Sequence, residues 1–168
     1  MRSIPKKVKY LLNGIGIIYV LALAYILFLR SLGADYAWTY PEYLRAMSNF
    51  VPLKSIYVLL TTPVISSAII KRFLLNFVGN IALFIPWGFL LPIHIEKTRK
   101  FMNFALTSLA TIVLIETVQI FSMLGSFDVE DILLNMLGAS IGFYCWKVLL
   151  GKKHSRRSID DYKRTRWY

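Results

Sequence analysis

The sequence has few of the residues from which soluble catalytic centres are commonly built. Its 168 residues include one cysteine, Cys145, so an intramolecular disulfide is excluded. There is no glycine-rich loop of the kind that binds phosphate. Ser122 and Ser126 have no neighbouring histidine or lysine that would activate a serine nucleophile. These absences argue against a disulfide-rich domain, a P-loop protein and a serine hydrolase.

Acidic residues are also scarce, with 9 of them against 20 lysines and arginines, which gives a formal net charge of +11. In a soluble protein this excess would suggest a nucleic-acid partner. Here the composition is 57% hydrophobic and the mean hydropathy is +0.55. The basic residues lie mostly at the ends of apolar runs and in the C-terminal tail, a pattern typical of membrane proteins. We therefore expect a membrane-lipid partner and no nucleic acid.

Long apolar runs dominate the sequence. Each is close to the ~20 residues that a helix needs to cross a bilayer. The pattern predicts an all-α, polytopic membrane bundle whose four transmembrane helices cover Leu11–Leu29, Phe73–Ile93, Phe101–Phe121 and Ile132–Leu150.

A further apolar stretch, Ile56–Ile70, is too short to be a fifth span. At ~1.5 Å of rise per residue it falls short of a ~30 Å hydrocarbon core, and Pro63 interrupts it. We expect an interfacial or re-entrant segment in the first outer loop.

Basic residues also predict the topology, because cytoplasmic loops are enriched in lysine and arginine. The N-terminus, the link His94–Lys100 and the tail are basic, whereas the turn Ser122–Asp131 has no basic residue. We therefore expect a multi-pass membrane protein with both termini in the cytoplasm and that turn outside. Residues 1–150 would form the transmembrane domain and residues 151–168 a basic cytoplasmic tail.

With this topology, polar residues from three spans fall at one depth in the outer leaflet. Ionisable groups within spans are costly and usually mark function. These residues form the predicted polar pocket: Asn76, Asn80, Glu116, Gln119, Asp128, Asp131 and Asn135.

Structural roles are open for most members of this set. Asp128 could cap the fourth helix, with Asp131 as its capping-box partner. The asparagines and the glutamine could simply hydrogen-bond between helices. Glu116 is harder to explain as structure: it would be protonated, paired with Arg72, hydrated or in contact with a ligand. Glu130 is expected to face water.

Two small residues extend the face of Asn135 along the fourth span. Gly138 and Gly142 form a small-xxx-small pattern, which allows a neighbouring helix to approach closely. We expect this face to pack against the third span.

Metal binding is a minor alternative, and no other cofactor is predicted. The histidines, His94 and His154, would lie on the cytoplasmic side, far from the outer-leaflet acids, which argues against zinc. Mg²⁺, Mn²⁺ or Ca²⁺ could instead bind oxygen ligands, here Glu116, Asp128, Asp131 and Asn135.

Several short motifs, in their order and spacing, resemble the VanZ-like family. NFVGN from Asn76 with FIPWGFLL from Phe84 resembles its first signature, and NFVP from Asn49 resembles an upstream loop motif. ETVQ from Glu116, DVED from Asp128, NMLG from Asn135 and then Gly142 resemble its second signature. The turn has Gly125 and Ser126 where many members carry an arginine, so no role of such an arginine is transferred.

The resemblance implies a small bacterial membrane protein from a family whose namesake is associated with resistance to teicoplanin and related lipoglycopeptides. We expect a non-enzymatic protein whose outer-leaflet pocket binds an envelope lipid, a cell-wall precursor or a lipoglycopeptide. The alternative is an intramembrane enzyme that modifies an envelope lipid, with Glu116 as acid or base and Asp128 or Asp131 assisting. Proton or cation transport is disfavoured, because the inner halves of the spans offer few polar residues. The sequence leaves the oligomeric state open.

Overall fold

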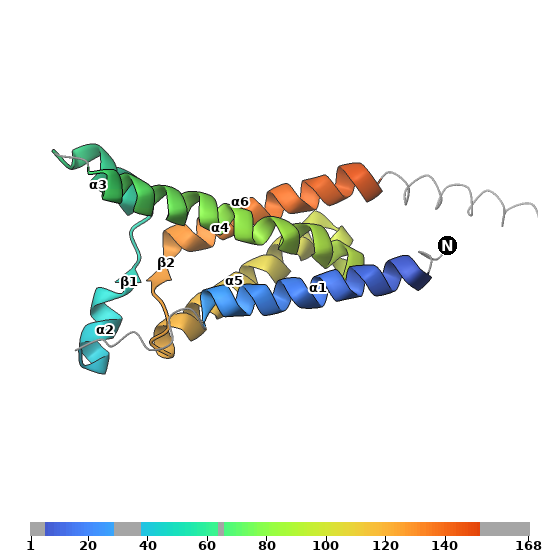
Figure 1. Ribbon diagram of the computed structural model, residues 1–168, viewed down its shortest axis with the longest axis horizontal. Coiled ribbons are helices and arrows are strands. Elements are labelled where there is room, and N and C mark those ends of the chain that lie inside the picture. The colour runs from blue at the N-terminus through green and yellow to red at the C-terminus, as the bar shows by residue number, and fades with distance from the viewer. Residues whose placement is uncertain (1–5, 29–37, 64–65, 152–168) are drawn as a thin grey trace, which may run out of the picture.

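Long helices dominate the described part of the protein (Figure 1). The computed structural model describes residues 6–28, 38–63 and 66–151. Within these ranges, four helices are long and apolar enough to cross a membrane, which confirms the expected all-α membrane bundle. They are α1 (Lys6–Leu27), α4 (Ser67–His94), α5 (Phe101–Phe121) and α6 (Val129–Trp146).

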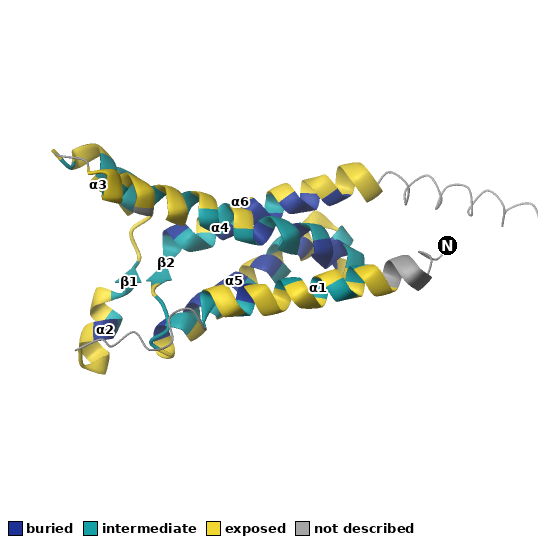
Figure 2. Ribbon diagram, in the orientation of Figure 1, coloured by how far each residue is buried: buried dark blue, intermediate teal, exposed yellow. Residues whose placement is uncertain are grey.

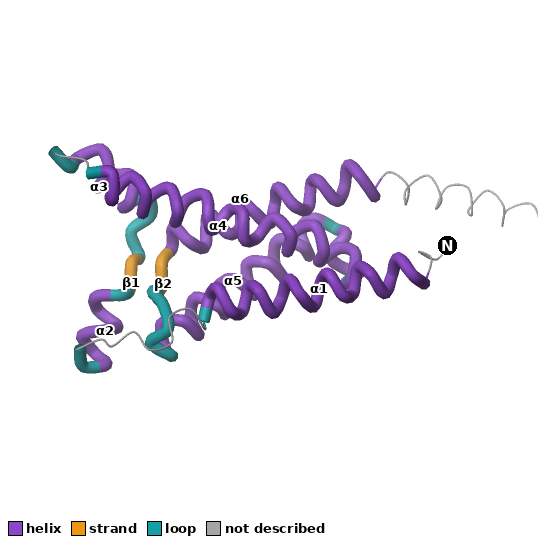
Figure 3. Tube along the Cα trace, viewed as in Figure 1, coloured by secondary structure: helices purple, strands orange, loops and turns teal. Residues whose placement is uncertain are grey.

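Successive long helices run in opposite directions, so the start of α1 and the end of α6 lie at the same end of the bundle (Figure 1). The shorter elements are α2 (Tyr40–Ala46), β1 (Ser48–Asn49), α3 (Lys54–Thr61), η2 (Glu96–Arg99), β2 (Phe127–Asp128) and η3 (Lys147–Gly151). Figure 3 shows the two strands side by side at the opposite end, with α2 and α3 close by. We call this the sheet end.

The apolar stretch Ile56–Ile70 divides between two elements. Helix α3 ends at Thr61, two residues before Pro63, since proline disfavours helical conformation in the residue before it. Helix α4 then begins at Ser67, well before the predicted Phe73, because the Ser66 hydroxyl accepts the backbone N–H of Ile69 and caps the helix. The eight residues of α3 span only ~12 Å, too little to cross a bilayer.

Helices α4 and α6 make the closest helix contact. A Cβ atom on Gly138 or Gly142 would overlap the backbone carbonyl oxygens of Ile81 or Ile85 on α4. Gly88 of α4 is pressed against the α6 backbone in the same way. The prediction of close packing at Gly138 and Gly142 therefore had the wrong partner, which is the second span rather than the third. Glycine on both helices is what lets these two backbones meet.

The apolar core lies where α4, α5 and α6 meet (Figure 2). Phe84, Phe104 and Phe143 are fully or almost fully buried there, and the rings of Phe104 and Phe143 lie 4.4 Å apart. Helix α1 is mostly exposed, and one of its anchors is the Tyr19 hydroxyl, which donates to the Leu83 carbonyl at 2.8 Å. In a bilayer such an exposed apolar face contacts lipid.

Candidate functional site

The strands β1 and β2 are distant in sequence, and their pairing brings Asn49 into contact with Asp128. Strand β1 pairs in parallel with β2, with Asn49 opposite Asp128. The Asn49 side-chain amide donates to Oδ1 of Asp128 at 3.0 Å, and the same oxygen accepts the backbone N–H of Glu130 at 2.8 Å. Asp128 is therefore the N-cap of α6. Asn49 was missed as a site residue, although it opens the upstream loop motif NFVP.

Glu130 does not face water as expected. It is 6% exposed, and its Oε1 accepts the backbone N–H of Ser55 at 2.9 Å. The reason lies at the start of α3, where Leu53 occupies the N-cap position with a left-handed φ of 62°. A leucine side chain has no acceptor for the free N–H groups of the first turn, so Glu130 of α6 supplies one.

Asp131 joins α6 to α4. Its Oδ1 accepts the side-chain amides of Asn76 at 3.0 Å and Asn80 at 2.5 Å. The Asn80 amide also lies 3.4 Å from Oδ1 of Asn76. Asp131 is thus an interhelical acceptor and not the capping-box partner of Asp128. The two asparagines reach it together because their i,i+4 spacing places them on one helix face.

Glu116 lies deepest among the acids, with 3% of its surface exposed. Its Oε2 is 3.4 Å from the backbone nitrogen of Asp128, which donates to it. The side chain of Arg72, the proposed partner, is outside the described residues. Burial raises the pKa of the Asp128 carboxyl, and hydrogen bonds from Glu130 and Asn49 oppose that rise. We call Glu116, Asp128, Glu130 and Asp131 the acid cluster.

The other two predicted pocket residues do not bond to the acid cluster. The Gln119 side chain donates to the Leu27 carbonyl at 2.9 Å and so ties α5 to α1. Asn135 is 3% exposed, and its Oδ1 has no hydrogen-bond partner among the described residues.

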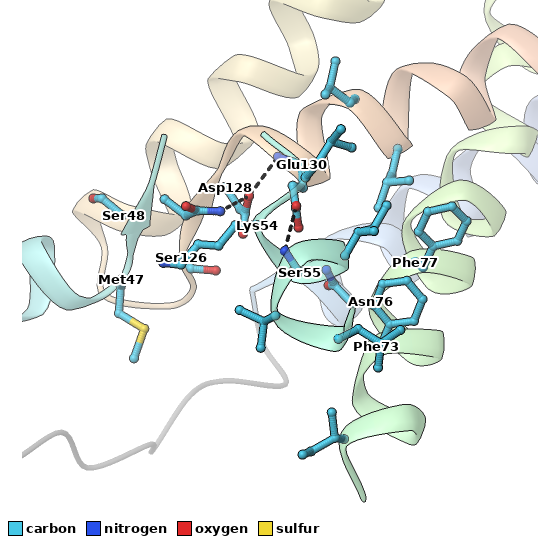
Figure 4. Close-up of a pocket in the computed structure, with 18 of the residues that line it drawn as sticks. Met47, Ser48, Lys54, Ser55, Phe73, Asn76, Phe77, Ser126, Asp128 and Glu130 are labelled. Atoms are coloured by element: carbon cyan, nitrogen blue, oxygen red, sulfur yellow. Dashed lines mark hydrogen bonds between the residues drawn. The ribbon is translucent and has the colours of Figure 1, made fainter. Parts of the chain in front are cut away.

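A cavity of about 460 Å³ opens beside the acid cluster, between β1, α3, α4 and α6 (Figure 4). Asp128, Glu130 and Asn76 lie on its wall with Lys54, whereas Glu116 does not line it. The rest of the wall is largely apolar, from residues such as Leu53, Val58, Leu59, Ile69, Phe73, Phe77, Leu133 and Leu134. Its volume is within the ~300–1,000 Å³ of small-molecule sites. We call it the sheet-end cavity.

The described residues contain no group of three or more histidine, cysteine, aspartate or glutamate side chains that could hold a metal ion. The carboxylates of the acid cluster accept hydrogen bonds from amides and backbone N–H groups instead. Their arrangement can therefore hold elements together and present acceptors to a ligand.

The sequence was compared with models of known protein families. Residues 16–150 match the family described as VanZ/LLP1. The chain belongs to the VanZ/LLP1 family. The match covers all four long helices except the first turns of α1, and it includes both the acid cluster and the sheet-end cavity. Comparisons with curated proteins and with solved structures gave no match.

Proposed function

We propose that this VanZ/LLP1 family member binds an amphiphilic molecule of the bacterial cell envelope in the sheet-end cavity. The class includes an envelope lipid, a lipid-linked cell-wall precursor and a lipoglycopeptide. The ligand's polar part lies against Asp128 and Glu130, and its hydrocarbon part lies between α3, α4 and α6.

One observation carries this proposal: the cavity combines a polar corner with an apolar wall. Figure 4 shows Asp128, Glu130 and Lys54 together, while Phe73 and Phe77 lie apart from them on α4. Convergent polar groups beside an apolar surface match the two parts of an amphiphile. Because the cavity is lined by the membrane-spanning helices α4 and α6, its ligand can enter from the bilayer.

The orientation of the protein is part of the proposal. We place both termini in the cytoplasm and the sheet end outside, because the basic link His94–Lys100 lies at the opposite end of the bundle, where α6 also ends, and the basic residues 151–168 follow α6 in the sequence. The orientation can be tested with single cysteines introduced at Ser126 or Ser155 in a Cys145→Ser background. Intact cells are treated with a thiol reagent that does not cross the membrane, and the labelled position is identified. Ser126 is exposed. Labelling at position 126 alone is expected; labelling at position 155 alone overturns the orientation.

Co-purified lipid tests the binding itself. Leu59 lines the cavity, whereas the adjacent Leu60 is 79% exposed and does not. Leu59→Trp fills the cavity and is expected to remove the lipids that mass spectrometry finds on the purified wild type, whereas Leu60→Trp retains them. Equal lipid content in both variants refutes binding at this site. In a host that the protein protects from teicoplanin, the same pair of variants should differ in susceptibility.

The enzymatic alternative predicts a chemical product. It rests on Glu116, which is buried beside Asp128 but is not on the cavity wall. Lipid mass spectrometry of cells with and without the protein separates the two functions. A modified lipid that disappears in Glu116→Gln cells establishes an enzyme; an unmodified lipid that only co-purifies supports binding.

A further inference from the structure

We infer that the ligand of the sheet-end cavity carries a primary ammonium group on its headgroup, as an aminophospholipid does. This inference rests on the proposed function and specifies its ligand. It follows from the hydrogen-bonding capacity and the charge of the polar corner.

The polar corner holds unused acceptors. A carboxylate has two oxygens and about four lone-pair sites. In the described part of the chain, the bonds to Asp128 fall on Oδ1 and the bond to Glu130 falls on Oε1. Oδ2 of Asp128 and Oε2 of Glu130 therefore have capacity for a donor from a ligand.

Charge favours a cation in this position. Two carboxylates and one lysine, Lys54, line the described cavity, so its polar corner is acidic overall. Glu130 is 6% exposed and the described residues give it only a neutral backbone donor. A buried carboxylate that has no cationic partner is costly. A ligand ammonium beside Glu130 offsets that cost. The charge of Lys54 acts on Asp128, and the adjoining phosphate of the ligand would lie against this lysine.

The donors required are N–H groups. A primary ammonium has three, as lysine does, and so bonds directly to carboxylate oxygens. A quaternary ammonium has none and is usually held over aromatic faces. The aromatic residues of this wall, Phe73 and Phe77, stack on each other with centroids 5.6 Å apart, away from the carboxylates (Figure 4). The corner therefore favours ethanolamine-type over choline-type headgroups.

Lipid competition on the purified full-length protein tests this inference. The probes are dioleoyl phosphatidylethanolamine, phosphatidylcholine and phosphatidylglycerol, which share their acyl chains, and bound lipid is counted by native mass spectrometry. The ethanolamine lipid is expected to bind about tenfold more tightly than the other two, which corresponds to ~1.4 kcal/mol. Equal binding of the three by the wild type overturns the inference without the use of any variant.

Variants of Asp128 and Glu130 test whether these two carboxylates cause the headgroup preference. Glu130→Gln keeps an acceptor for the Ser55 N–H and Asp128→Asn keeps a capping oxygen, so the double variant removes charge with little change in shape. It is expected to bind the three lipids equally. Glu96→Gln, at the other end of the bundle, is the matched control. A preference that survives in the double variant also overturns the inference.

The Leu59→Trp variant separates the two proposals. Loss of all lipid binding in Leu59→Trp, with no headgroup preference in the wild type, refutes the ammonium and leaves the proposed function intact. Binding that is unchanged by Leu59→Trp refutes both.

Discussion

The two halves of α6 are built in opposite ways. Its first turns, from Asp128 to Asn135, carry acids that accept hydrogen bonds from α3, α4 and β1. Its second half, from Gly138 to Trp146, has glycines in backbone contact with α4 and aromatic rings against α5. Lipid is as apolar as leucine, so helices in a membrane gain little from hydrophobic contact and depend on close packing and hydrogen bonds. The first half of α6 uses hydrogen bonds to hold its neighbours, and the second half uses close packing.

The difference teaches what each half tolerates. The glycine half is sensitive to volume, because backbone atoms cannot move aside as side chains do. The acid half is sensitive to the loss of an acceptor, and volume matters less there because a cavity adjoins it. Substitutions that change only one property should therefore affect only one half.

The largest loss of stability is expected in the glycine half. Gly142→Leu forces α6 away from Ile85, and Gly88→Ala does the same from the α4 side. Overpacking costs about 1–3 kcal/mol and more when backbones must separate, so we expect ~3 kcal/mol or more for the leucine variant. Thermal unfolding in detergent and accumulation in membranes measure this. Gly79→Ala is the control, because a Cβ at Gly79 meets nothing within 4 Å; normal stability of Gly142→Leu would show that the contact is absent.

An intermediate loss is expected at Asp131. Asp131→Leu keeps approximate size but removes the acceptor of the Asn76 and Asn80 amides. An unpaired donor that is fully buried costs about 1–3 kcal/mol. Asn80 is half-buried and Asn76 is exposed, so the loss should lie in the lower part of that range. Asp131→Asn retains one acceptor oxygen and should lose less. Unfolding midpoints of the two variants test this prediction. If Asp131→Leu and Asp131→Asn have the same midpoint, the hydrogen bonds to Asp131 contribute no stability.

A smaller loss is expected at the cap. Asp128→Ala removes the acceptor of Glu130 N–H and of Asn49, and lost N-caps cost about 1 kcal/mol. Asp128→Asn should be close to neutral, since asparagine caps a helix about as well. An alanine variant as stable as the asparagine variant would contradict the capping role.

The same residue gives a pH dependence with a defined sign. Burial raises the pKa of Asp128 in the folded protein above the unfolded value of ~3.9. The folded state then binds the proton more tightly, so this contribution to stability is complete below the unfolded pKa and is lost as pH rises through the folded pKa. The Asp128→Asn protein should lack this slope in a series of unfolding midpoints against pH. An identical slope in both proteins would assign it to other groups.

The smallest change in stability is expected at Glu116, the residue on which the enzymatic alternative rests. Glu116→Gln keeps shape and an acceptor for the Asp128 N–H but removes the ionisable proton. Because a buried charge is costly, the variant should fold as well as the wild type or better. The enzymatic alternative predicts that this variant loses the cellular phenotype, whereas binding in the sheet-end cavity, which Glu116 does not line, predicts that the phenotype is kept. A well-folded variant with full activity would refute the enzymatic alternative.

The sequence predicted those parts of the fold that depend on local composition. The range Phe101–Phe121 matches α5, because this mostly apolar run is bounded by Lys100 and Ser122. The predicted antiparallel order of the spans also put Asn76, Asn80 and Asp131 at one depth in the membrane. The structure brings the side chains of these three residues into contact.

The sequence did not predict the direction in which side chains point around a helix axis, or the contacts between residues far apart in the chain. Depth in a span does not fix the direction around the helix axis, so Gln119 turned out to face α1 and the glycines turned out to face α4. Asn49 meets Asp128 across 79 residues, and Ser55 meets Glu130 across 75. Pairs this far apart, in two-residue strands, leave no periodic signal in a single sequence.

The pairing of β1 with β2 also sets an order for biosynthesis. Asn49 leaves the ribosome 79 residues before Asp128. At about 5–20 residues per second, that delay is roughly 4–16 s. Throughout it, the segment from α2 to α3 has been synthesised while its partners on α6 have not. The sheet end therefore cannot complete its folding until Phe127 and Asp128 have been synthesised, and a chain truncated before Phe127 would leave that segment open to proteases.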